Sequence, residues 1–288
     1  MRLLPAVLGT VSLVVVPLAL LLLCLPLAVA FGFFTSADRS VLVGRPSSFT
    51  YASAKRTYRL HQPADVKRDT PIIVGLHEFG GTSQRFAYYT ALHNVAPDAV
   101  IIYPDALRSD TPGPRAGWNA KFCCGSGWVN RTDDVGFISS LVDHVREECG
   151  ALEGKVFVAG FSNGAFMTHR LAAERPELFD AVGVSSGSIG STALVIEPTK
   201  PMPILLMHGK NDRVVPYRGG PGKTDPDFRW LGFAHTCDVW RSINGDVAQT
   251  NVISYDENGH EWDGWRIAKL WRRAPAASVE VVSFFRSI

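Results

Sequence analysis

The stretch Lys155-Val156-Phe157-Val158-Ala159-Gly160-Phe161-Ser162-Asn163-Gly164 places a serine directly after an apolar run that reads as a buried strand. The residues that follow, 165–173, have the pattern of a helix. Glycines two positions before and two after the serine allow a sharp turn, because glycine has no Cβ to clash. A G-x-S-x-G sequence between a strand and a helix is the pattern of a nucleophile elbow, which exposes the serine hydroxyl. The stretch therefore predicts an α/β fold in which Ser162 is a nucleophile.

Two further polar residues follow in the order that such a serine requires. The strand-like run 203–209 leads into Asp212, and the run 251–255 leads into a polar loop that contains His260. Taken singly, Asp212 could be a turn residue or a helix cap, and His260 a solvated loop residue. A serine nucleophile needs a base, and the base needs an orienting carboxylate. Because all three residues follow predicted strands, where open α/β sheets place their ligand crevice, we predict a Ser162–Asp212–His260 triad.

The run 71–81 predicts a second element of the site. It reads as a buried strand that ends in His77-Glu78-Phe79 and a pair of glycines. Acyl transfer builds negative charge on the former carbonyl oxygen, and two backbone N–H groups usually meet that charge. We expect these N–H groups to come from Asn163 and Phe79, with Glu78 as the alternative to Phe79. A purely structural glycine turn is the other interpretation.

Several shorter motifs accompany these residues in a fixed order along the chain. They are Leu76-His77 with Gly80-Gly81, Tyr103-Pro104-Asp105-Ala106, Gly117-Trp118-Asn119-Ala120 with Cys123-Cys124-Gly125, Asp133-Asp134-Val135-Gly136-Phe137-Ile138, Ser162-Asn163-Gly164, His208-Gly209 with Asp212 and Val214-Val215-Pro216-Tyr217, and Gly259-His260 with Trp262. Over residues 55–288 the chain resembles the polyhydroxybutyrate depolymerase-like esterases, a group that includes feruloyl and acetylxylan esterases of carbohydrate esterase family 1.

The resemblance implies an α/β-hydrolase fold, with a mostly parallel central sheet and helices on both faces. It also implies a serine carboxylester hydrolase that forms an acyl-enzyme on Ser162 and needs no cofactor. The expected substrates are feruloyl, acetyl or hydroxyalkanoate esters, either small or bound to a polymer. A serine peptidase on the same fold, and a membrane-tethered binding protein with weak or lost catalysis, are the alternatives.

The chain departs from the family pattern at a few positions. Glu78 stands where the family usually has glycine, which puts the geometry of the oxyanion loop in question. The loop 256–261 is more acidic than the usual glycine-rich version, and Asp263-Gly264 replaces the usual Pro-Gly after Trp262. Trp118 and Trp262 could stack on an aromatic acyl group or a sugar ring, with ordinary packing as the alternative.

Composition excludes several other functions. The net charge of +2 comes without a basic run, so nucleic-acid binding is not indicated. The chain contains neither a phosphate-binding G-x-x-x-x-G-K-[ST] loop nor a G-x-G-x-x-G fingerprint. His77-Glu78 and His260-Glu261 lack the second histidine of an H-E-x-x-H zinc motif, so we expect no metal.

The N-terminal residues predict export. Residues 1–34 are almost wholly apolar after Arg2 and could be an uncleaved signal anchor, while Ala28-Val29-Ala30 fits a signal-peptide cleavage site. Both alternatives place the rest of the chain in a secreted or secretory-lumen compartment, with a membrane contact only if the segment is retained. We expect a short stalk over residues 35–54 and the catalytic domain over residues 55–288.

Such a compartment favours disulfides. Besides Cys24, the chain has Cys123, Cys124, Cys149 and Cys237, which allow three pairings. We expect Cys123 and Cys124 to pair separately with Cys149 and Cys237, with free buried thiols as the alternative. Asn130-Arg131-Thr132 is an acceptor sequence for a glycan if the secretory route is eukaryotic.

Periodicity predicts the remaining elements. We expect strands over 56–61, 99–103 and 180–185, and helices over 83–95, from 133 or 134 to about 145, over 228–243 and over 278–287. Residues 106–132 read as a long loop, which in a compact domain is usually functional.

Overall fold

A computed structural model of the chain describes residues 44–108, 115–222, 228–264 and 275–288. Internal contacts divide the chain into Met1–Val41 and Leu42–Ile288, and the following description concerns the second unit. The predicted leader lies outside the described residues. Within the described part of the chain, no helix combines the length and apolar character needed to cross a bilayer.

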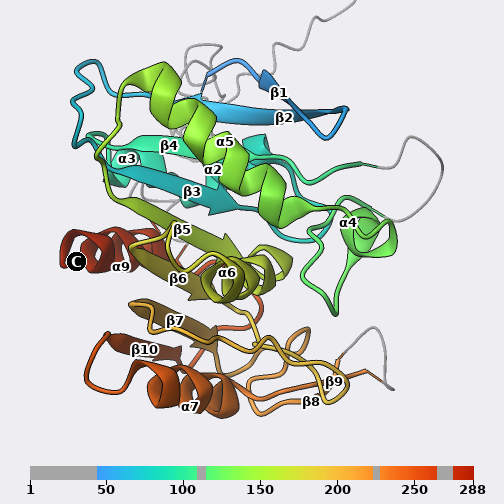
Figure 1. Ribbon diagram of the computed structural model, residues 1–288. Helices are drawn as coiled ribbons and strands as arrows, with labels where there is room; N and C mark the ends of the chain where they lie inside the picture. The colour runs from blue at the N-terminus through green and yellow to red at the C-terminus, as the bar shows by residue number, and fades with distance from the viewer. Residues whose placement is uncertain (1–43, 109–114, 223–227, 265–274) are drawn as a thin grey trace, which may run out of the picture. The chain divides into compact units, whose positions relative to one another are not determined.

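An eight-stranded sheet forms the centre of the unit, in the order β1-β2-β4-β3-β5-β6-β7-β10 (Figure 1). Antiparallel pairing is confined to β2, which pairs with β1 and β4, and the strands from β4 to β10 run parallel. The strands are β1 Ser47–Tyr51, β2 Ala54–His61, β3 Ile72–Leu76, β4 Val100–Pro104, β5 Val156–Phe161, β6 Ala181–Ser185, β7 Ile204–Gly209 and β10 Thr250–Tyr255. A separate antiparallel pair consists of β8 Gly220–Pro221 and β9 Arg229–Trp230. The mostly parallel sheet that the sequence predicted is confirmed.

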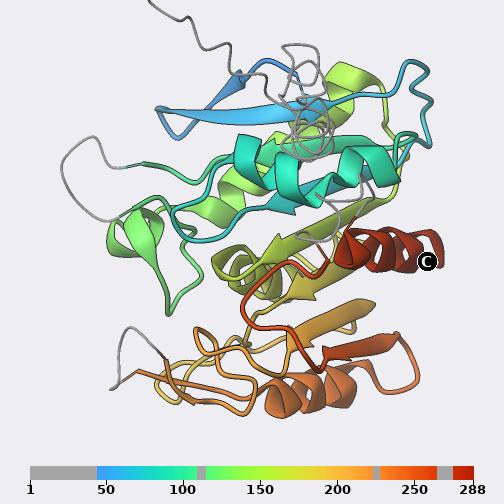
Figure 2. The ribbon, with the colours of Figure 1, turned by 180° about the vertical axis from the view of Figure 1, so that it is seen from behind.

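Helices cover both faces of this sheet. Figure 1 shows α5, α6 and α7 over one face, and Figure 2 shows α2, α3 and α9 over the other. The helices are α2 Ser83–Thr90, α3 Leu92–Val95, α4 Gly125–Val129, α5 Asp134–Cys149, α6 Asn163–Glu174, α7 Phe233–Asn244 and α9 Ala276–Arg286.

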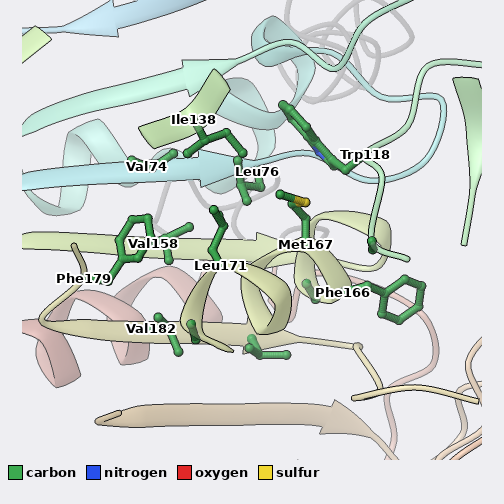
Figure 3. Close-up of a cluster of buried hydrophobic side chains, with 14 of the residues drawn as sticks. Val74, Leu76, Trp118, Ile138, Val158, Phe166, Met167, Leu171, Phe179 and Val182 are labelled. Atoms are coloured by element: carbon green, nitrogen blue, oxygen red, sulfur yellow. The ribbon is translucent and has the colours of Figure 1, made fainter. Parts of the chain in front are cut away.

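The strands build two hydrophobic cores because their side chains alternate between the faces. Val74 and Leu76 of β3 join Val158 of β5 and the inner sides of α5 and α6 in one core, part of which Figure 3 shows. Ile73 and Phe157, one position away, join α2, α3 and α9 in the other core. Strands buried on both faces read as continuous apolar runs, which is why the sequence located them.

The structure differs from the predicted elements in three places. The helix expected over 83–95 is capped by Thr82 and is divided into α2 and α3 by Ala91, which has a φ of 48°. The helix expected over 228–243 begins only at Phe233, because Arg229–Trp230 form strand β9. Part of the expected stalk is β1, whose Phe49 and Tyr51 pack near Phe137 of α5. Aromatic residues at alternate positions therefore carry the sheet into a segment that its polar composition suggested was a linker.

Candidate active site

Ser162 occupies a tight turn between β5 and α6. Its backbone has φ 54° and ψ −118°, a conformation that a residue with a side chain adopts rarely. A Cβ on Gly160 would collide with the carbonyl of Gly164, and a Cβ on Gly164 with the carbonyl of Leu76. The two glycines are thus required by backbone contacts on either side of the serine.

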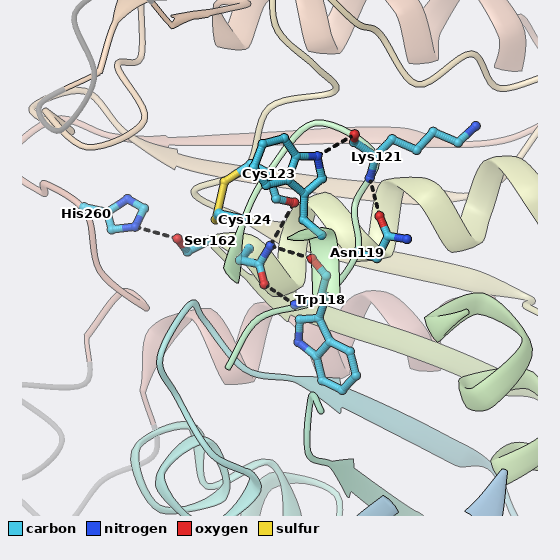
Figure 4. The surroundings of a disulfide bond; sticks show 9 residues. Trp118, Asn119, Lys121, Cys123, Cys124, Ser162 and His260 are labelled. Carbon is cyan, nitrogen blue, oxygen red and sulfur yellow. Dashed lines mark hydrogen bonds between the residues drawn. A yellow bond between two sulfur atoms is a disulfide. The ribbon is translucent and has the colours of Figure 1, made fainter. Parts of the chain in front are cut away.

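A continuous chain of hydrogen bonds links Ser162, His260 and Asp212. His260 Nε2 lies 2.8 Å from Ser162 Oγ, the contact drawn in Figure 4. His260 Nδ1 lies 2.7 Å from Asp212 Oδ2. Because the carboxylate accepts from Nδ1–H, Nε2 of the neutral ring is left to accept from the serine hydroxyl. The structure therefore brings together the three residues that the sequence singled out, although they come from three separate loops.

His260 is not the only group that holds Asp212 in place. Its Oδ1 accepts from the backbone N–H groups of Val214 and Val215 at 2.8 and 2.9 Å. Its Oδ2 also lies 3.3 Å from His208 Nε2. Burial by itself raises the pKa of Asp212, but the hydrogen bonds from His208 and His260 outweigh burial and hold that pKa well below its usual value. The carboxylate is therefore ionised throughout the range in which a histidine titrates.

The loop after β3, in which we expected an oxyanion-binding N–H, is fixed through His77. His77 Nδ1–H donates to the Glu78 carbonyl at 2.7 Å, and His77 Nε2 accepts from Ala106 N–H at 3.0 Å. Phe79, whose N–H we expected in the oxyanion hole, is 40% exposed. Asn163 is the first residue of α6, and the first N–H groups of a helix have no intrahelical acceptor.

Glu78 does not distort this loop. It is not among the described residues with positive φ, so its Cβ is accommodated without backbone strain. Its Oε2 accepts from Tyr89 Oη at 2.6 Å, and its Oε1 lies 3.6 Å from Arg85 Nε. Both partners belong to α2, so the carboxylate is turned toward that helix.

The two tryptophans expected to contact substrate are buried. Trp118 is 0% exposed and Trp262 is 1% exposed. Trp118 Nε1–H donates to the His77 carbonyl at 3.0 Å, and Trp262 Nε1–H donates to Ser278 Oγ at 2.9 Å. Since neither ring presents a face to solvent, the expectation of stacking on substrate is not met, and both residues support the loops from inside.

The disulfide expectation was wrong. Cys123 and Cys124 are bonded to each other, while Cys149 and Cys237 are free thiols. The loop that carries the bonded pair is attached near the start of α5, where Asn119 N–H donates to Asp134 Oδ2 at 2.8 Å. Cys149 ends this 16-residue helix, so at 1.5 Å per residue the helix separates Cys149 from the loop by roughly 20 Å, far beyond disulfide reach.

The side chain of Asn163 fixes the loop with the disulfide against the elbow. Asn163 Oδ1 accepts from Trp118 N–H at 2.6 Å, and Nδ2 donates to the carbonyls of Trp118 and Cys123 at 3.2 and 3.3 Å. Figure 4 shows the disulfide beside Ser162, on the side away from His260. We expected only the backbone of Asn163 to act at the site. The residues that bind its side chain, Trp118 and Cys123, lie 45 and 40 positions earlier in the sequence.

Among the residues that the structure describes, no three or more His, Cys, Asp or Glu side chains come together as a candidate metal site.

The order of the strands and the elbow between β5 and α6 are those of the α/β-hydrolase fold. Residues 131–223 match the family model described as phospholipase/carboxylesterase. A solved acetyl xylan esterase from Aspergillus awamori has the same fold, with a TM-score of 0.53 at 18% identity over 75% of this chain and 94% of that one.

Named relatives agree with the resemblance found in the motifs. The protein named "Putative esterase NocK" from Nocardia uniformis subsp. tsuyamanensis is 30% identical over 201 residues, which cover 67% of this chain and 57% of NocK. Feruloyl esterase C from Emericella nidulans is 28% identical over 211 residues, which cover 68% of this chain and 71% of that protein. The chain spans little more than half the length, 57% and 58%, of the first two curated relatives it matches. The chain thus has the α/β-hydrolase fold and is similar to carboxylesterases, among them feruloyl and acetylxylan esterases.

Proposed function

We propose that the chain is a serine carboxylester hydrolase that uses Ser162, His260 and Asp212. The observation that carries the proposal is the pair of distances around His260, 2.8 Å to the serine oxygen and 2.7 Å to the carboxylate. This geometry supplies a nucleophile, a base and an orienting group within hydrogen-bond reach of one another. The similarity to esterases supports the same conclusion.

In the first half of the reaction His260 Nε2 takes the hydroxyl proton of Ser162 while Oγ bonds to the ester carbonyl carbon. The carbonyl electron pair moves to oxygen, and the N–H groups of Asn163 and Phe79 would stabilise that charge. The tetrahedral intermediate collapses, the bond to the alcohol oxygen breaks, and His260 returns the proton to the leaving alcohol. Ionised Asp212 holds the Nδ1–H tautomer and stabilises the imidazolium throughout.

In the second half water replaces the alcohol. His260 removes a proton from water as the water oxygen attacks the acyl carbon. When the intermediate collapses, the bond between the acyl carbon and Ser162 Oγ breaks, and His260 returns the proton to Oγ. The products are a carboxylic acid and the regenerated hydroxyl of Ser162, with no net consumption of any cofactor.

We place the natural substrates among feruloyl, acetyl or hydroxyalkanoate esters, the classes that the motif resemblance implies. The feruloyl esterase among the relatives and the acetyl xylan esterase among the solved structures support the first two classes. A panel of methyl ferulate, p-nitrophenyl acetate and a 3-hydroxybutyrate ester, compared by kcat/KM, ranks the three.

We also propose that the domain works outside the cytoplasm. The apolar N-terminal residues support export, and the bonded Cys123–Cys124 pair supports an oxidising compartment. Asn130 of the glycan acceptor sequence is exposed, which is compatible with modification.

The decisive experiment is hydrolysis of p-nitrophenyl acetate by the Ser162→Ala variant. We expect kcat/KM to fall about a thousandfold or more, because nothing then forms the acyl-enzyme. Ser139→Ala is the matched control, since Ser139 is buried in α5 and its hydroxyl bonds to the Val135 carbonyl. Turnover that survives in the Ser162 variant, or ester inertness of the folded parent chain, would refute the proposal.

A further inference from the structure

His208 is a buried histidine that directly contacts the triad. It is the penultimate residue of strand β7, which leads into the loop of Asp212, and it is 2% exposed. Its Nε2 lies 2.9 Å from the Val215 carbonyl and 3.3 Å from Asp212 Oδ2. The ring packs near those of Phe233 of α7 and Tyr217, with centroids 5.1 and 5.7 Å away.

These contacts determine where the proton of His208 resides. A carbonyl oxygen and a carboxylate oxygen can only accept, so Nε2 must carry the hydrogen. Nδ1 is buried and has no hydrogen-bond partner among the described residues, so a second proton there would be an unpaired buried donor. The Nε2–H of the ring therefore lies between the Val215 carbonyl and Asp212 Oδ2.

The position of this N–H matters because of the oxygen it reaches. Oδ1 of Asp212 is occupied by two backbone N–H groups, and Oδ2 is the oxygen that accepts from His260. A donor on Oδ2 resists rotation of the carboxylate away from His260. It also takes up part of the negative charge that would otherwise act on the imidazole of His260 alone.

We propose that His208 is a positioning residue of the triad, whose Nε2–H orients Asp212 Oδ2 toward His260 and limits the basicity of the Asp212–His260 pair. The titratable groups that face His208 are Asp212 and Tyr217, and the hydroxyl of Tyr217 is engaged with Ser254 of β10 at 2.8 Å. From α7 the facing side chain is the non-ionisable Phe233. The proposal rests on the proposed function for its kinetic consequences, but not for its prediction about protonation.

Two substitutions separate this role from packing. His208→Phe removes the N–H and keeps an aromatic ring, whereas His208→Gln retains a side-chain N–H donor of similar reach. His93→Phe is the matched control, because His93 is also buried but contacts Tyr103 and His61, away from the triad. Melting temperatures of all variants establish that each folds.

The kinetic readout is the acid limb of the kcat/KM profile between about pH 4.5 and 9, which reports the pKa of the base in the free enzyme. Without the His208 donor the carboxylate should stabilise the imidazolium of His260 more strongly. For His208→Phe we expect the limb to move up by about 0.5–1 pH unit and kcat to fall about tenfold, with KM within about twofold of the parent. His208→Gln should keep the parent limb, and so should His93→Phe.

A second measurement needs neither activity nor a variant. In the parent chain with ¹⁵N-labelled histidine, NMR should find a proton of His208 on Nε2 and none on Nδ1 at neutral pH. The Nδ1–H resonance of His260 gives the pKa of His260 directly, even if the chain hydrolyses no ester tested.

An Nδ1–H form of His208 at neutral pH would overturn the proposal. So would an unshifted His260 pKa in folded His208→Phe, or equal shifts in His208→Phe and His208→Gln, because a packing role predicts either result. If the parent chain hydrolysed none of the esters, this result would refute only the proposed function. The NMR measurements would still decide the role of His208.

Discussion

The conformation of single residues accounts for much of the site. Ser162 keeps a positive φ because its backbone is held from both sides: its N–H donates to the Ser185 carbonyl at 3.0 Å, and its carbonyl accepts from Phe166 N–H at 3.0 Å. Backbone strain of this kind persists only where the surrounding structure over-determines it. The two hydrogen bonds tie Ser162 to the end of β6 and to α6, and thereby hold its Oγ toward His260.

At the residue scale, Glu78 is the departure with a testable consequence. Its carboxylate accepts from Tyr89 and lies near Arg85, so its charge is directed toward α2 and partly neutralised. We expect Glu78→Gln to raise kcat for p-nitrophenyl acetate by no more than about threefold, because only a residual repulsion of the oxyanion is removed. The surface variant Glu153→Gln, which loses an exposed ion pair with Arg68, serves as the control. A tenfold or larger gain for Glu78→Gln alone would mean that the charge acts directly on the oxyanion.

Sequence reasoning was effective for residues whose role depends on order along the chain. Ser162, Asp212 and His260 could be predicted because the order of these residue types after strands is a property of the chain itself. The burial of Trp118 and Trp262 could not, because it depends on how the loops of β3, α4 and α9 close over each ring. The contact of His208 with Asp212 was equally hidden, although its position four residues before Asp212 offered a signal.

At the element scale, the loop from Gly117 to α4 forms a fixed wall beside Ser162. Three separate attachments hold it: Asn163 binds its Trp118 backbone, Asp134 of α5 binds Asn119 N–H, and the Gly127 N–H donates to the Gly117 carbonyl at 3.0 Å. The disulfide lies within the loop and closes no long segment. The loop is thus positioned by buried polar groups on two helices, which no pattern within 106–132 revealed.

Replacing Asn163 tests this arrangement. Asn163→Ala keeps the backbone N–H but leaves the buried N–H of Trp118 without its acceptor, which we expect to cost about 1–3 kcal/mol of unfolding free energy. The loosened loop should raise KM more for a feruloyl ester than for p-nitrophenyl acetate, because a larger acyl group reaches further along the wall. Urea unfolding and the two KM values check these expectations. Asn244→Ala is the control. It removes a buried side-chain amide of α7 that bonds to the backbone of Met202, far in sequence from the elbow. It should lower stability but change the two KM values equally.

At the scale of the whole molecule, the sheet separates two apolar cores, and the first of them encloses an ionisable group that takes no part in the proposed chemistry. His169 of α6 is fully buried, accepts from Trp240 Nε1–H at 3.0 Å through Nδ1, and has no partner for Nε2 among the described residues. Burial lowers the pKa of His169 to about 3 from 6.5. The folded chain therefore keeps this ring neutral in conditions where an unfolded chain protonates it.

This difference makes folding stability depend on pH. Below pH 6.5 the unfolded state binds a proton that the folded state does not, so the free energy of unfolding falls as pH falls, until the folded pKa is reached. Between pH 7 and 4.5 the loss due to His169 amounts to about 2–3 kcal/mol. His169→Gln keeps an acceptor for Trp240 and cannot be protonated, so its stability should decline less over this range by about that amount.

Chemical denaturation at successive pH values measures the two curves. Only their difference in slope is diagnostic, because the substitution also changes packing and shifts the whole curve of the variant. His235→Gln provides the control, since His235 is an exposed residue of α7 and its curve should run parallel to that of the parent. Parallel curves for the parent and His169→Gln would show that the buried ring gains a proton in the folded state through an opening of the core, and that burial of this side chain is not maintained in acid.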